Sequence, residues 1–201
     1  SLGLIQSAIS RADDIISNTH LKLSLRLKPG AEGAIPVCVF NPLPYKSKRV
    51  VEADFILPSI RWEKEDCVIT VKDSRGNVVA SQSIKENSNF NVHWHKRVAF
   101  ESELEPFSIS RFDIEYTFGK KEEKPVKAPL DTISFHVYED NEDSWSQGRE
   151  CYVSMGKNPV SAEMTGMRVV ENGELFTVYE KQFEYGLSKI ILNEKHYNNY
   201  D

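Results

Sequence analysis

The spacing of apolar residues changes once along this sequence, and that change constrains the fold more than any other feature. Between residues 2 and 18, apolar side chains recur three or four residues apart, at Ile5, Ala8, Ile9, Ala12, Ile15 and Ile16. This spacing predicts an amphipathic helix with one apolar face. Beyond it, apolar and polar residues mostly alternate, and no second strongly periodic helix follows. The sequence therefore predicts a mainly β protein preceded by one N-terminal helix.

Short alternating segments separated by turn residues indicate the strands. The first is 21–28, in which leucine alternates with lysine, serine and arginine until Pro29 and Gly30 interrupt it. A hairpin is expected over 67–84, with its turn at Asp73 to Asn77. Further strands are expected at 36–40, 49–57, 92–100, 112–116, 133–137, 151–155, 167–170, 174–185 and 186–196. Many short strands with frequent turns are typical of a β-sandwich.

Composition and charge exclude several classes of partner. The 201 residues carry a net charge of −5, with acidic and basic residues interspersed, so we expect neither nucleic acid nor a membrane surface as a partner. No apolar run reaches the length of about 18 residues that a membrane span needs. The three cysteines, Cys38, Cys67 and Cys151, lie far apart and form no C-x-x-C pair, so neither a disulfide framework nor a zinc knuckle is expected. Free thiols on apolar segments suit a reducing compartment, and we expect a cytoplasmic protein.

The most informative segment is PVCVFNPLPYKSKRVVEADFILP, residues 36–58. It resembles the V-x-V-x-N-P-L-x strand that opens the small β-domain of glycoside hydrolase family 38, the α-mannosidases, directly after a three-helix bundle. Residues 99–116 resemble the closing strands of that domain, although Glu105 to Ile109 replace the family's Pro-x-x-Gly-Tyr turn. Residues 138–150 are similar to an Asp-rich loop with a Trp, early in the large β-domain, and 171–201 to the strands beyond it. The family's G-x-L-x-S-L hairpin has no counterpart in 118–132.

The resemblance implies a division of the chain into four parts. Residues 1–20 would be a remnant helix of the helix bundle, whose apolar face packs on helices outside this chain. Residues 21–118 would form the small β-sandwich domain, and 132–201 would begin a larger β-sandwich domain. Between them, 119–131 is charged, contains two prolines and lacks periodicity, as expected of a linker.

The resemblance also implies a parent enzyme whose chemistry lies elsewhere. Family members are retaining α-mannosidases that use zinc and an aspartate nucleophile, and retention requires two carboxyl groups about 5 Å apart. The metal ligands and the nucleophile belong to the catalytic domain and the start of the helix bundle, and no residue here matches them. We therefore expect no catalytic residue, no cofactor and no activity in this chain alone, with zinc or another divalent metal in the parent's catalytic domain. The expected partners are a mannose-containing glycan bound by the parent enzyme, the missing catalytic and helix-bundle domains, and a second copy of the chain.

The loop at 139–150 contains the only expected site residues, Asp140, Asp143 and Trp145. Sugar sites combine an aromatic face with carboxylates that accept hydroxyl hydrogen bonds, so this loop is a candidate rim of the parent's mannose pocket. The alternative is a solvated acidic turn. A calcium loop of the EF-hand type is not expected, because Trp145 stands where that loop requires glycine.

Two other charged or imidazole-bearing motifs have simpler interpretations. His93 and His95 flank Trp94 and share one face of a strand, a spacing that can bind a metal, but no third ligand is evident. We expect a solvent-facing pair beside a core tryptophan. Asp13 and Asp14 are expected on a solvated helix face.

A stand-alone β-sandwich that binds carbohydrate or protein is the alternative to an α-mannosidase segment. The N-terminal helix discriminates between them, because a remnant of a bundle exposes an isoleucine-rich stripe and a stand-alone module need not. An independent hydrolase is not supported, because no nucleophile or acid/base constellation is evident in the sequence.

Overall fold

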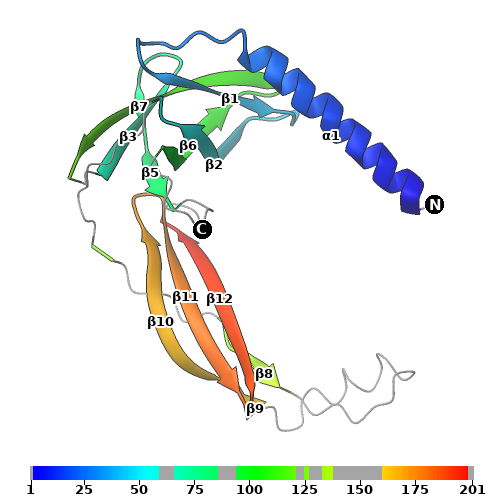
Figure 1. Cartoon of the computed structure of the whole chain (residues 1–201), viewed down its shortest axis with the longest axis vertical. Helices are drawn as coiled ribbons and strands as arrows, with labels where there is room; N and C mark the ends of the chain where they lie inside the picture. The colour runs from blue at the N-terminus through cyan, green and yellow to red at the C-terminus, as the bar shows by residue number, and fades with distance from the viewer. Residues whose placement is uncertain are drawn as a thin grey trace. The chain divides into compact units, whose positions relative to one another are not determined.

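The computed structural model describes residues 2–58, 66–85, 94–120, 125–126, 133–137 and 160–198, and they form two compact units. The first unit is Ser1–Glu123 and the second is Lys124–Asp201. Within this described part, one N-terminal helix precedes antiparallel sheets, so the predicted fold class is confirmed (Figure 1). The finer domain boundaries at 20, 118 and 131 stay predictions.

The helix α1 spans Leu2–Ser24 and is longer than the spacing of its isoleucines predicted. The strand expected at 21–28 is wrong: residues 21–24 continue the helix, and the Leu25 N–H donates to the Leu21 carbonyl at 3.0 Å. Leu, Lys and Arg are strong helix formers, and no helix breaker occurs before Pro29. The helix therefore continues through residues 21–24, although leucine alternates with polar residues there.

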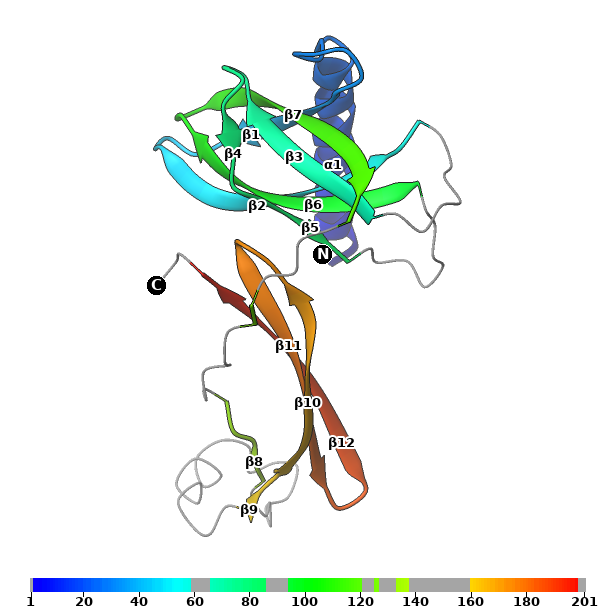
Figure 2. The same cartoon turned by 90° about the vertical axis from the view of Figure 1, so that its left-hand side faces the viewer.

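Two sheets face each other in the first unit and form a β-sandwich (Figure 2). Each sheet draws strands from distant parts of the chain, in the orders β1-β7-β3-β4 and β2-β6-β5. The strands are β1 (Ile35–Asn41), β2 (Ser47–Ile56), β3 (Asp66–Asp73), β4 (Val78–Val79), β5 (Ser81–Ile84), β6 (His95–Leu104) and β7 (Ser108–Gly119).

The hairpin expected over 67–84 forms only in part. Its turn is as predicted, with Gly76 at a φ of +86°, and β4 pairs with β3. After Ala80 the chain leaves that sheet, and β5 pairs with β6 in the opposite sheet. The segment thus joins the two layers at one edge of the sandwich instead of completing a hairpin.

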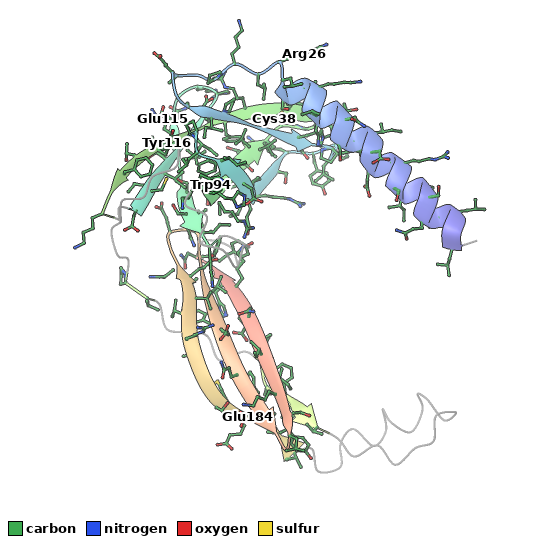
Figure 3. The ribbon with its side chains drawn as sticks, in the orientation of Figure 1. Arg26, Cys38, Trp94, Glu115, Tyr116 and Glu184 are labelled. Carbon is green, nitrogen blue, oxygen red and sulfur yellow. The ribbon has the colours of Figure 1, made fainter. Side chains whose placement is uncertain are left out.

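The core of the first unit lies between the sheets. Phe100 and Phe112 are buried at its centre, with ring centroids 4.9 Å apart, and they come from opposite layers. Trp94 and Tyr116, labelled in Figure 3, pack against the same cluster while partly buried. The tryptophan expected in the core, Trp94, is thus in contact with it.

The second unit contains a three-stranded antiparallel sheet in the order β10-β11-β12. A two-stranded ladder of β8 (His136–Val137) and β9 (Val160–Ser161) belongs to the same unit. The three long strands are β10 (Glu163–Asn172), β11 (Phe176–Tyr185) and β12 (Ser188–Tyr197). Register shifts interrupt the pairing of β10 with β11, whereas β11 and β12 pair without interruption.

Candidate functional site

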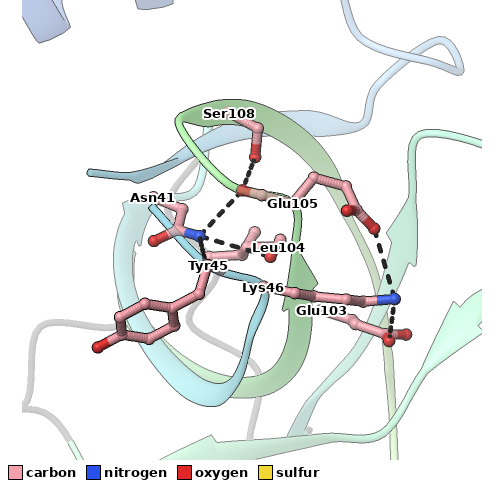
Figure 4. Close-up of polar contacts among 7 residues, drawn as sticks. All are labelled: Asn41, Tyr45, Lys46, Glu103, Leu104, Glu105 and Ser108. Atoms are coloured by element: carbon pink, nitrogen blue, oxygen red, sulfur yellow. Dashed lines mark hydrogen bonds and ion pairs between the residues drawn. The ribbon is translucent and has the colours of Figure 1, made fainter. Parts of the chain in front are cut away.

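The N-P-L-P sequence that ends β1 is the corner where the chain passes from one sheet of the sandwich to the other. Asn41 is 2% exposed, and its Nδ2 lies 3.0 Å from the Tyr45 carbonyl, 2.9 Å from that of Glu105 and 3.4 Å from that of Leu104 (Figure 4). Its Oδ1 accepts the Leu43 N–H at 3.1 Å. One amide side chain therefore donates to backbone carbonyls both in the segment before β2 and at the end of β6. The prolines of the N-P-L-P sequence prevent a regular ladder at this corner.

The turn between β6 and β7 is held against this corner. The Phe107 N–H donates to the Leu43 carbonyl at 3.0 Å, and the Ser108 hydroxyl donates to the Glu105 carbonyl at 2.6 Å. Phe107 adopts a φ of +47°, which is strained for a residue with a bulky side chain, yet the side chain is 68% exposed. Glycine would adopt such a φ without strain.

A second polar contact anchors the segment after α1 to the sandwich. Asp113, 4% exposed on β7, accepts the Gly30 N–H at 3.1 Å and lies 3.1 Å from Arg111 Nε. A Cβ on Gly30 would stand 2.5 Å from an Asp113 carboxylate oxygen, so any other residue here would displace that side chain. Arg111 also donates to the Lys28 carbonyl at 3.2 Å. The chain between α1 and β1 therefore makes hydrogen bonds with β7 side chains at Lys28 and Gly30.

The apolar face of α1 remains open. No residue of the helix is buried, and the exposed fractions of Ile5, Ile9, Ile15 and Ile16 are 58%, 50%, 68% and 51%. Near the C-terminal end of α1, the His20 and Phe40 rings lie edge to face at 6.0 Å. A row of large exposed apolar side chains is typical of an interaction surface. Asp13 and Asp14 are exposed, as expected.

A buried ionic cluster lies on one face of the second unit's sheet. Lys181 Nζ is 2.9 Å from Glu194 Oε2, and His196 Nε2 is 3.1 Å from the same oxygen. Burial acts to raise the pKa of Glu194, but hydrogen bonds from Lys181 and His196 outweigh it and hold the pKa below its ordinary value. The other carboxylate oxygen, Oε1, is buried and accepts no hydrogen bond from the described residues. No sequence pattern pointed to this cluster, because its members come from two strands and read as ordinary surface charges.

The sequence-predicted rim residues Asp140, Asp143 and Trp145 lie outside the described residues, and so does His93. They stay predictions. His95 begins β6, and the described residues include no group of three or more His, Cys, Asp or Glu side chains that could hold a metal ion.

The two cysteines in the described ranges, Cys38 and Cys67, form no disulfide and are half-buried, and burial raises the pKa of the Cys38 thiol. A raised pKa keeps that thiol protonated and unreactive. In the same ranges, no helix is long and apolar enough to cross a membrane.

The chain matches none of the models of known protein families compared with it, and none of the curated proteins.

Proposed function

We propose that the chain is a non-catalytic β segment of a retaining, metal-dependent α-mannosidase that hydrolyses O-glycosidic bonds in mannose-containing glycans. The observation that carries the proposal is the order of the parts around the N-P-L-P corner. An exposed amphipathic helix comes first, then a strand that ends in Asn41, then a small sandwich with its own core. The resemblance to family 38 glycoside hydrolases leads us to expect this order.

The exposed stripe of α1 supports a role within a larger assembly. Burying one isoleucine side chain contributes about 1.5–3 kcal/mol, so an unpartnered row of four favours packing against further helices. Zinc or another divalent metal, the aspartate nucleophile and the acid/base carboxyl would come from the parent's catalytic domain. In this arrangement the chain supplies a scaffold, and Asp140, Asp143 and Trp145 supply one edge of the sugar pocket.

A stand-alone β-sandwich module that binds carbohydrate or protein is the second candidate. It is favoured by the core of the first unit, which closes between its two sheets without help from α1. The two candidates differ in what the helix does, because a stand-alone module has no need of an exposed apolar stripe.

Activity measurements test the proposal directly. The 201-residue chain and the parent protein would each be assayed with a chromogenic α-mannoside, with and without zinc. We expect turnover by the parent, with retention of anomeric configuration, and none by the chain alone. Zinc-dependent turnover by the rigorously purified chain, or a parent protein without α-mannosidase activity, would refute the proposal.

The pocket-rim assignment has its own test in the parent protein. Trp145→Ala should raise KM for the mannoside and lower kcat/KM by the equivalent of about 1–3 kcal/mol, typical of a lost aromatic contact. The melting temperature should change little, because the residue belongs to a polar loop sequence. Unchanged kinetics together with a much lower melting temperature would show that Trp145 is a core residue instead.

A further inference from the structure

A polar groove of about 560 Å³ opens on the first unit and is lined by residues of both sheets. The end of β6 forms one wall, and the turn between β3 and β4 forms the other. Ser110 and Arg111 of β7 contribute to its lining. The volume falls within the range of roughly 300–1,000 Å³ that is usual for small-molecule sites.

The wall at the β3–β4 turn is held in shape by Asp73. Its Oδ1 accepts the N–H groups of Arg75 and Asn77 at 2.9 and 2.8 Å, and its Oδ2 accepts Asn77 Nδ2 at 3.0 Å. The hydrogen bond from the Asn77 side chain is the main reason that the pKa of Asp73 lies below its ordinary value. This wall is therefore formed before any ligand arrives.

Charges of both signs line the groove in equal number: Lys46, Lys48, Arg75 and Arg111 face four carboxylates, those of Asp73, Glu101, Glu103 and Glu105. Most are already paired. Lys46 Nζ lies 2.6 Å from Glu103 and 3.4 Å from Glu105, and Lys48 Nζ lies 3.4 Å from Glu101 (Figure 4 shows the pairs of Lys46). These hydrogen bonds raise the pKa of Lys46 and lower that of Glu103. A charged ligand of either sign would have to displace an existing partner.

Backbone N–H and C=O groups of β6 also line the groove over a short stretch. β5 pairs with β6 only as far as Ser81 opposite Phe100, and within the described ranges the last backbone bond on that side is Glu101 N–H to the Ala80 carbonyl. Backbone groups on an antiparallel strand alternate in direction, so those of Glu103 point to the same side. The Glu105 carbonyl already accepts hydrogen bonds from Asn41 and Ser108. A peptide adding as a strand would find one residue to pair with, too little for a ladder.

We propose that this groove binds a neutral saccharide of one or two rings. Each sugar hydroxyl donates one hydrogen bond and accepts two, which matches a surface that carries both cationic donors and carboxylate acceptors. A neutral ligand can form hydrogen bonds with the carboxylate lone pairs and the N–H groups that the ion pairs do not use. The ion pairs then stay intact. An apolar ligand would leave these groups without partners, at a cost that opposes binding. The inference deepens the second candidate above, a carbohydrate-binding β-sandwich, and it does not depend on α-mannosidase activity of the parent protein.

The test is an NMR titration of the ¹⁵N-labelled 201-residue chain with methyl α-D-mannopyranoside and, separately, methyl α-D-glucopyranoside. We expect saturable shifts of the amides at 73–76 and 101–105, with a dissociation constant on the order of 1–10 mM because the groove is open. Glu103→Ala should weaken binding about tenfold, as loss of a charged acceptor does. Glu184→Ala is the matched control, because it removes an ion-paired, half-exposed glutamate from the second unit and should leave binding unchanged.

Two further arms use inorganic phosphate and a capped Glu-Lys-Glu-Lys peptide. Shifts of the groove amides by either one, with both sugars silent, would overturn the saccharide assignment in favour of an anion or a peptide. Sugar shifts confined to other residues, or none up to about 100 mM, ten times the weakest affinity expected, would also overturn it. Should Glu103→Ala fail to fold, Glu103→Gln keeps the side-chain shape and removes the charge, and the same weakening is expected.

Discussion

Lys181 on β11 and Glu194 on β12 form an ion pair, 2.9 Å between Nζ and Oε2, with side chains only 3% and 6% exposed. The same two strands carry a second pair, Lys189 with Glu184 at 3.1 Å, whose side chains are 77% and 43% exposed (Glu184 is labelled in Figure 3). The two pairs have similar geometry and differ in burial, so they separate the energetic effect of burial from that of charge.

Lys181→Met should destabilise the second unit by about 3 kcal/mol, the lower end of the range for breaking a buried pair, because Glu194 would keep its charge without this partner. Lys189→Met is the control and should cost about 1 kcal/mol or less. Urea unfolding followed by the amide resonances of β11 measures both. Equal effects of the two substitutions would mean that solvent reaches Glu194 as easily as Glu184.

Acid should weaken the second unit through Glu194. Its pKa in the folded protein is lowered, so the unfolded chain takes up the proton first as the pH falls. The contribution to stability is complete above the unfolded pKa of about 4.3 and is lost as the pH falls through the lower, folded value. The difference in unfolding free energy between the wild type and Glu194→Gln should therefore shrink between about pH 6 and pH 3. A difference that stays constant across that interval would contradict this assignment.

Asn41→Ala should destabilise the first unit by about 1–3 kcal/mol, because the Tyr45 carbonyl loses its side-chain donor and the Leu43 N–H loses its side-chain acceptor. Asn41→Asp should be at least as damaging, since its carboxylate faces the carbonyl oxygens of Tyr45 and Glu105. Tyr45→Ala serves as the control: the carbonyl of residue 45 remains, and the side chain it removes is 56% exposed. Thermal unfolding monitored by near-ultraviolet circular dichroism distinguishes them. If Tyr45→Ala melts at as low a temperature as Asn41→Ala, the Tyr45 ring, and not the Asn41 amide, stabilises this corner.

Phe107→Gly should stabilise the first unit by about 1 kcal/mol, because glycine adopts a φ of +47° without the strain that a Cβ imposes. Phe107→Ala keeps the Cβ and removes only the ring, so it should be close to neutral. Denaturant midpoints for the three proteins provide the comparison. Loss of stability in both variants would show that the phenylalanine ring packs in solution and that backbone strain is not the dominant effect.

Replacing both Ile9 and Ile16 by Ser should reduce self-association of the chain and leave its β content intact, since neither side chain is buried. Sedimentation velocity and far-ultraviolet circular dichroism measure the two effects. Asp13→Ser with Asp14→Ser provides a control on the polar face and should not reduce association. Global unfolding of the Ile9/Ile16 variant would show that the helix belongs to the β core.

Several local features could be predicted from the sequence, and each depends on interactions between near neighbours. The spacing of Ile5, Ile9 and Ile16 indicated α1 because helical hydrogen bonds join residues four apart. Gly76 indicated the β3–β4 turn because that turn requires a positive φ. The strand around Lys189 to Leu192 followed from its β-branched residues and flanking turns. The rim residues Asp140, Asp143 and Trp145 lie outside the described residues and stay a prediction.

Other features depend on residues that meet only in the folded chain. Residues 21–28 were predicted as a strand from their local alternation, but residues 21–24 continue the preceding helix. The transfer of β5 to the opposite sheet depends on β6, which lies well beyond the expected hairpin.

The sequence by itself determined the class of the fold, one helix followed by antiparallel strands, because the period of apolar residues is a local property. Only the tertiary structure decided which strands share a sheet, that Lys181 meets Glu194 out of solvent, and that Asn41 joins β1 to the end of β6. Burial and pairing depend on which distant segments lie side by side, and no local spacing of residues encodes that.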